Sequence, residues 1–130
     1  MIILPEHLTK NNKQRNKKEE ENEQGEFVSW ARSTYPFLLI TCSLGGIPCS
    51  IRQGVRYKRM GYKKSWPDLT IAYPNRGFHG CFIEMKKTNG SKDSDQEKLI
   101  LVLNSLGYYA KTCIGIEDAK ATLTWYMKGN

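Results

Sequence analysis

Two short strand-like runs joined by a turn place the strongest constraint on the fold of this chain. Residues 69–73 (LTIAY) and 80–86 (GCFIEMK) are joined through PNRG, which is rich in turn residues. We predict that the two runs pair as a hairpin. Each carries an acid that an ordinary core strand would lack: Asp68 opens the first run, and Glu84 interrupts the second, followed by Lys86.

The rest of the chain predicts a mixed α/β domain with a small central sheet flanked by helices. Hydrophobic periodicity, turn residues and prolines place the other elements. We expect helices at about 19–34 (ended by Pro36), 50–60, 94–106 and 117–127, and strands at 37–42 and 108–113. The helix at 94–106 has two candidate N-caps, Asp93 and a Ser94–Glu97 capping box.

Residues 1–18 are polar and are expected to form a flexible N-terminal arm before a single domain at 19–130. The sequence has no apolar run of membrane-spanning length and no signal-peptide core, so we expect a cytoplasmic protein without a membrane partner. Its four cysteines form no CxxC pair, which argues against zinc and favours reduced thiols. Cys42, Cys81 and Cys113 lie in apolar runs, so we expect them to be small core residues.

Basic residues predict a polyanionic partner. The net charge is +7, and residues 50–66 contain six basic residues and no acid. We expect this segment to bind the DNA backbone. On a helix, Arg52, Arg56 and Arg59 share one face, although Gly54 weakens that helix. The candidate DNA-binding residues are Arg52, Arg56, Lys58, Arg59, Lys63 and Lys64.

The acids of the two strands suggest a metal site. Alternation along the second strand puts Phe82, Glu84 and Lys86 on one face, so Glu84 and Lys86 could form a structural ion pair. In a hairpin, however, Asp68 lies near Glu84, and two converging carboxylates repel unless a divalent cation lies between them. Such oxygen ligands suit Mg²⁺, with Mn²⁺ as a substitute.

These residues resemble a known nuclease signature. Pro67-Asp68, a fifteen-residue spacer and Glu84-Met85-Lys86 match the PD-(D/E)xK pattern, whose fold is the restriction-endonuclease-like core. WPDL, FIEMK, a Gly-Ser loop reaching Gln96 and LNSLGYYA together resemble the VRR-NUC family, over residues 19–127. Ser65-Trp66 departs from the Gly and small apolar residue that relatives usually have before Pro67, and the spacer from Gly90 to Gln96 is longer.

Gln96 has two interpretations. It precedes Leu99, Ile100 and Leu103 by three, four and seven residues, which places it on the buried face of its helix. It either completes a capping box with Asp93 or, as the resemblance implies, supports Lys86 or the nucleophilic water.

The resemblance also implies a glutamate of the first helix as a metal ligand. Helical geometry aligns Glu20 best with the apolar stripe around Phe27 and Ala31, together with Gln24, and Glu23 second. Relatives further imply the Met85 carbonyl as a ligand. The implied metal ligands are thus Glu20, Asp68, Glu84 and Met85, and the implied catalytic residues are Asp68, Glu84, Lys86 and Gln96.

The implied function is a Mg²⁺-dependent endodeoxyribonuclease with no nucleotide cofactor. Short stand-alone members resemble phage-encoded homodimers that cut branched DNA such as Holliday junctions, which would place this chain in a host cytoplasm. A non-specific or restriction-like duplex nuclease shares every catalytic residue. A non-catalytic basic DNA-binding module explains the charge alone, and a metal-free protein in which Glu84 and Lys86 simply pair is the remaining alternative.

Overall fold

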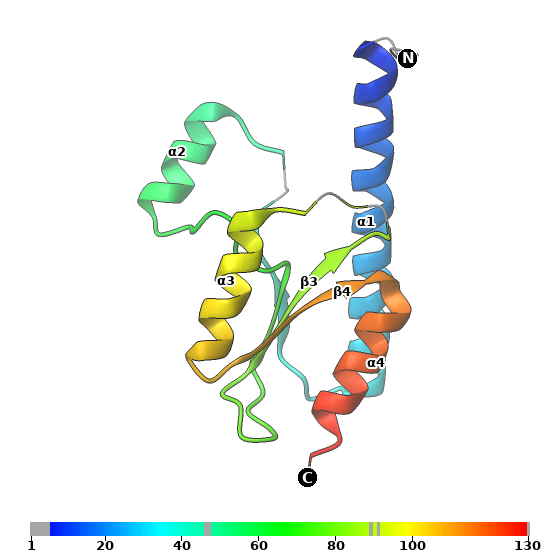
Figure 1. The fold of residues 1–130 in the computed structure, drawn as a ribbon, viewed down its shortest axis with the longest axis vertical. Coiled ribbons are helices and arrows are strands. Elements are labelled where there is room, and N and C mark those ends of the chain that lie inside the picture. The colour runs from blue at the N-terminus through cyan, green and yellow to red at the C-terminus, as the bar shows by residue number, and fades with distance from the viewer. Residues whose placement is uncertain (1–5, 46–47, 89, 91, 130) are drawn as a thin grey trace.

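The computed structural model describes residues 6–45, 48–88, 90 and 92–129. Helices and strands occur within them in the predicted order, which confirms the mixed α/β class (Figure 1). The elements are α1 (Glu6–Thr34), β1 (Ile40–Cys42), α2 (Ile51–Arg59), β2 (Leu69–Ile71), β3 (Cys81–Lys86), α3 (Ser94–Ser105), β4 (Tyr109–Ile114) and α4 (Gly115–Met127). No described helix is long and apolar enough to span a membrane.

The sheet has the strand order β1-β2-β3-β4. β2 pairs antiparallel with both β1 and β3, and Leu69 lies opposite Ile83, so the predicted hairpin is confirmed. β4 runs parallel to β3, and α3 makes the crossover that a parallel connection requires. β3 is therefore an interior strand that is buried up to Met85.

Helices cover both faces of the sheet (Figure 1). On one face, Ile83 and Met85 of β3 join a core with Phe27 of α1 and Leu123 of α4. On the other face, Phe82 packs against Leu103 of α3 and Ala110 of β4. The predicted alternation along β3 is confirmed, and it places Glu84 on the α3 side, where Phe82 also points.

Both ends of α1 were predicted from the sequence, and one of the two predictions was wrong. The helix ends at Thr34, before the Tyr35-Pro36 pair, as expected. It begins at Glu6, however, and so continues through residues expected to form a flexible arm. No Gly or Pro occurs between Glu6 and Gln24, so nothing in the backbone stops the helix from extending. The division of the chain at residue 18 stays a prediction.

The N-cap of α3 is Asp93. Its backbone is extended, and its carboxylate accepts hydrogen bonds from the backbone N–H groups of Asp95 and Gln96. The helix therefore begins at Ser94 itself, and the alternative capping box from Ser94 to Glu97 is wrong. A capped start fixes the first turn of α3, on which Gln96 lies.

α2 stands apart from the rest of the molecule (Figure 1). A capping box between Ser50 and Gln53 starts it, which offsets the weakness introduced by Gly54. None of its residues is buried, and it has no extensive packing against another described helix or strand. The predicted helix is confirmed, and its charged side chains are open to solvent.

The four cysteines are free thiols. Cys81 and Cys113 are buried in the core as expected, and burial raises the pKa of the Cys81 thiol to about 12. Cys42 was also expected to be a core residue, but it is exposed on the edge strand β1. A strand at the edge of the sheet leaves one of its faces open, which an apolar run in the sequence does not reveal.

The segment that leads into β2 contains a left-handed residue. Ser65 has a φ of +71°, a conformation that favours glycine because a Cβ atom crowds the backbone there. Relatives usually have glycine two residues before the Pro-Asp pair. This chain has serine there, but its backbone adopts the left-handed conformation that glycine favours. The turn aims Asp68 into the sheet.

We expect Ser65→Gly to stabilise the protein. Removing the side chain relieves the left-handed strain, and the free energy of unfolding should rise by up to about 1 kcal/mol. Ser29→Gly in the exposed interior of α1 is the matched control and should lower it by about 0.5–1 kcal/mol. Urea unfolding measures both, and a loss of stability in Ser65→Gly would contradict the prediction.

Candidate active site

Asp68 and Glu84 meet where the pairing of β2 with β3 ends. Because Leu69 lies opposite Ile83, the next pair along the ladder is Asp68 and Glu84. The backbone N–H of Asp68 donates to Glu84 Oε2 at 3.2 Å, and the N–H of Met85 donates to Asp68 Oδ2 at 2.8 Å. Each carboxylate thus occupies a backbone donor on the opposite strand segment, and the expected convergence of the two acids is present.

Burial makes this pair electrostatically unusual. Glu84 is only 3% exposed. Burial, followed by the charge of Asp68, raises the pKa of Glu84 to about 8, and burial also raises the pKa of Asp68. Near neutral pH without a cation, one carboxyl group keeps a proton and shares it with the other. The shared proton offsets the negative charge of the two carboxylates, and a bound cation would offset it in the same way.

Gln96 reaches the pair from α3. Its side-chain Nε2 donates to Glu84 Oε1 at 2.9 Å, while its backbone N–H is the one capped by Asp93. The side chain therefore serves the site and not the helix start. Its Oε1 atom is buried and has no partner among the described residues. A buried acceptor of this kind requires a donor, and a water molecule has the size and chemistry to supply it.

Lys86 stands at the open side of the acids. Its Nζ lies 3.8 Å from Glu84 Oε1, at the long limit of an ion pair, and the side chain is 23% exposed. It lines a cavity of about 220 Å³ with Gln96, and Lys87 and Lys92 line it as well. The ammonium group is thus shared between Glu84 and a space that an anion can enter. Lys87 and Lys92 were not predicted, since loop lysines carry no pattern.

Among the glutamates of α1, Glu20 faces the acids. Burial raises its pKa, the charge of Lys86 lowers it and the charge of Asp68 raises it, so both groups lie near its carboxylate. Glu19 instead pairs with Lys87. The placement of Glu20 agrees with the choice made from helical geometry, and its role as a ligand stays a prediction.

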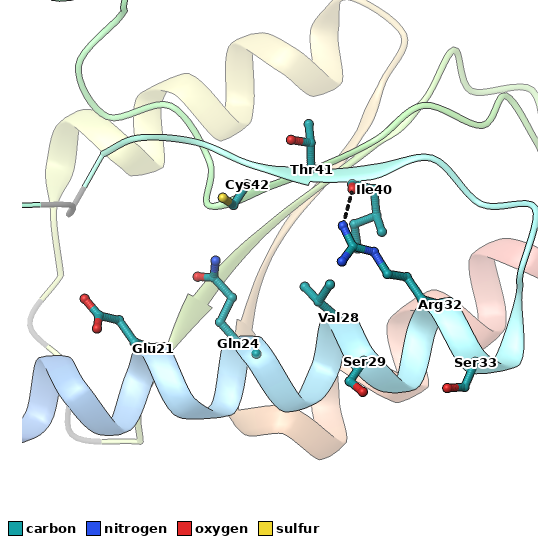
Figure 2. A pocket seen from close by; sticks show the side chains of 10 residues that line it. Glu21, Gln24, Val28, Ser29, Arg32, Ser33, Ile40, Thr41 and Cys42 are labelled. Atoms are coloured by element: carbon teal, nitrogen blue, oxygen red, sulfur yellow. Dashed lines mark hydrogen bonds between the residues drawn. The ribbon is translucent and has the colours of Figure 1, made fainter.

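Gln24 lines a larger cavity of about 590 Å³ between α1 and the edge strand β1, together with Glu21 and Cys42 (Figure 2). Arg32 closes one part of this groove by donating to the Ile40 carbonyl at 3.3 Å. The expectation that Gln24 accompanies Glu20 at the site stays a prediction.

The donor set suits a hard divalent ion. Within the described part of the chain, no three His, Cys, Asp or Glu side chains are close enough to hold a metal ion. Asp68 and Glu84 offer two carboxylates, the first half-buried and the second buried, and Gln96 Oε1 offers an unused acceptor for water. Mg²⁺ is bound in proteins by one or two carboxylates with several waters, so these residues fit it. Met85 has its side chain in the core, and its carbonyl stays a predicted ligand.

The basic segment lies on an exposed surface. Arg52, Arg56 and Arg59 of α2 are solvent-exposed, as is Lys58. Lys63 and Lys64 follow the helix and line a cavity of about 490 Å³ with Lys98 of α3. Lys98 extends this basic surface onto α3, where only the fold reveals it, because it lies 34 residues further along the chain.

A structural comparison supports the resemblance found in the sequence. A solved structure named "VRR_NUC domain protein" superposes with a TM-score of 0.70 and 27% sequence identity, covering 85% of this chain and 89% of that chain. No family model and no curated protein matches the sequence. The resemblance to the VRR-NUC family is therefore confirmed by fold, and it indicates a nuclease.

The buried acids predict that the metal-free protein loses stability as pH rises. Glu84 has an ordinary pKa of 4.5 and a folded-state pKa of about 8, so the folded protein binds a proton that the unfolded chain has lost. Stability therefore falls across this window. At pH 8 in EDTA, Glu84→Gln should be more stable than the wild type by roughly 1–3 kcal/mol, and the difference should shrink towards pH 4.

Denaturant unfolding at both pH values measures this difference. Glu97→Gln, on the exposed surface of the same helix as Gln96, is the control and should show no comparable change. Equal stability of Glu84→Gln and the wild type at pH 8 would contradict the prediction, because it would mean that folding does not raise the pKa of Glu84.

Proposed function

We propose that this chain, which shares its fold with a VRR_NUC domain protein, is a Mg²⁺-dependent DNA endonuclease that hydrolyses phosphodiester bonds. The observation that carries the proposal is the assembly of Asp68, Glu84, Lys86 and Gln96 at one end of the hairpin. A structural ion pair between Glu84 and Lys86 explains neither the second acid, the half-buried Asp68, nor the unused acceptor of Gln96.

The residues of the chain have distinct tasks in hydrolysis. A bound divalent cation supplies positive charge that lowers the pKa of water and balances charge on the phosphate. Asp68 and Glu84 would hold that cation, with Glu20 and the Met85 carbonyl as further ligands. Gln96 fixes the carboxylate of Glu84 and accepts a hydrogen bond from the attacking water through Oε1. Lys86 orients this water and offsets the negative charge that develops as a bond from phosphorus to a sugar oxygen breaks.

The basic surface supports DNA as the substrate. The residues are those of α2 and the segment after it: Arg52, Arg56, Lys58, Arg59, Lys63 and Lys64. No residue of α2 is buried, so its charged side chains are available to bind a partner. A phosphate backbone bound there would bring a phosphodiester towards Lys86 and the acids. Contacts of this type give affinity without sequence preference.

The preference for branched DNA follows from the family resemblance. We propose that the protein acts as a homodimer, because a two-fold dimer presents two active sites to the symmetric strands of a four-way junction. Exposed Leu101, Val102 and Leu106 on α3 offer apolar surface for such an interface. A nuclease without this preference would use the same residues and would cut linear duplex equally well.

Cleavage assays on end-labelled four-way junction, flap and linear duplex DNA test the proposal. We expect cuts with Mg²⁺ or Mn²⁺ and none with EDTA, and a preference for the junction. Lys86→Ala, Asp68→Asn and Glu84→Gln should each lower the rate by about 10²–10⁴-fold. Lys128→Ala, at the far end of α4, should cut like the wild type.

Salt-sensitive binding without cleavage under either metal would refute the nuclease and leave a basic DNA-binding module. Cleavage of linear duplex at the rate of the junction would instead refute the structural preference alone. A change of stability in the three variants with no activity to lose would favour the metal-free structural alternative.

The contribution of α2 can be measured separately. Arg56→Ala should leave the free energy of unfolding within about 0.5 kcal/mol of the wild type, because the side chain is exposed on an unpacked helix. It should weaken DNA binding and reduce the slope of log Kd against log salt by about 1. Fluorescence anisotropy across a salt series in EDTA measures this, with Lys128→Ala as the control. An unchanged slope would remove Arg56 from the DNA contact.

A further inference from the structure

Tyr62 lies between the basic helix and the acids. It follows α2 directly, and its backbone N–H donates to the Tyr57 carbonyl at 2.9 Å. Gly61, with a φ of +111°, turns the chain at this point, a conformation that glycine adopts without a steric penalty. The backbone that carries the tyrosine is thus held by the end of α2.

The hydroxyl of Tyr62 contacts Gly45 in the segment after β1. A Cβ atom at position 45 would overlap the hydroxyl oxygen, whereas it would lie 3.5 Å from the ring carbon Cζ, an ordinary contact. The same point lies 3.6 Å from the Ser43 hydroxyl. Glycine at position 45 therefore leaves space for the phenol oxygen of Tyr62, which the rest of the ring does not need.

This segment is bonded to the first acid. The backbone N–H of Ser43 donates to the Asp68 carbonyl at 2.8 Å, so the segment that the Tyr62 hydroxyl contacts is bonded to the residue that carries the first acid. Burial and then the charges of Asp68 and Glu84 raise the pKa of Tyr62, which keeps the hydroxyl protonated and able to donate. The Ser43 hydroxyl oxygen is buried without a partner among the described residues, and so is a second free polar group there.

We infer that Tyr62 binds substrate: its hydroxyl donates a hydrogen bond to a non-bridging oxygen of the DNA phosphate that enters the Asp68–Glu84 site, and the Ser43 hydroxyl stands ready as a second donor. This inference rests on the proposed nuclease. Phosphate oxygens are acceptors, so hydroxyl donors suit them. Lys86 and Gln96 reach the acids from β3 and α3, and Tyr62 belongs to the segment that joins the basic helix α2 to Asp68.

Tyr62→Phe isolates the hydroxyl, because the ring and its packing remain. We expect kcat/KM for DNA cleavage to fall about tenfold, the usual effect of losing one hydrogen bond to a charged group. Affinity for the same DNA in EDTA should fall several-fold, while thermal stability should not change. Tyr108→Phe, whose ring packs against Phe82 and His79 away from the acids, is the matched control.

Gly45 provides an independent test through a double-mutant cycle. Gly45→Ala should also lower cleavage and binding, because the added methyl group displaces the Tyr62 hydroxyl. In the Tyr62→Phe background the clash is absent, so Gly45→Ala should cause no further loss. Additive losses would overturn the inference, since they would mean that Gly45 acts independently of the hydroxyl.

The outcomes distinguish a role of the Tyr62 hydroxyl from a role of the Tyr62 ring, and both from a failure of the proposed nuclease activity. Normal cleavage and binding by Tyr62→Phe, with a defect only in Tyr62→Leu, would overturn the inference and assign Tyr62 to stacking on bases. If the wild type cuts no DNA under any metal, the proposed function fails, and binding in EDTA then decides. Weaker binding by Tyr62→Phe would still support the phosphate contact, and unchanged binding would refute it.

Discussion

The register between β2 and β3 places the carboxylates of Asp68 and Glu84 next to each other, and much of the site depends on that constraint. Glu84 accepts from the backbone N–H of Asp68, and Asp68 accepts from that of Met85, but the two carboxylate charges repel where little water is present to screen them. An amide from α3 and an ammonium from β3 offset this repulsion, whereas a partly buried glutamate from α1 adds a third negative charge nearby. Side chains from α1, β3 and α3 therefore all lie near the same two carboxylates.

Much of this could be predicted from sequence because the relevant signals are local. Alternation along β3 follows from the geometry of a strand, and Pro36 stops α1 wherever the rest of the chain lies. The turn between β2 and β3 brings Asp68 to Glu84 over a short separation. Gln96 was placed on the correct helix face by spacing alone, and its bond to Glu84 decided between a cap and a site role.

Other features depend on contacts that no local pattern encodes. The start of α1 was missed because a polar helix without an apolar stripe resembles a flexible segment. The groove that Gln24 lines lies between α1 and β1, two elements that only the fold brings together. The relation between Gly45 and Tyr62 joins two loops, and it appears only when the segments after β1 and α2 lie side by side.

The isolation of α2 has a consequence for how such a protein can change over generations. A helix whose side chains support no core is free to exchange residues without risk to folding. If α2 binds DNA as we propose, substitutions there would change the affinity for DNA and leave the acids of the hairpin unchanged. Proteins with this fold could therefore acquire new binding partners through substitutions in α2 alone. Selection would then act on α2 and on the two acids almost independently.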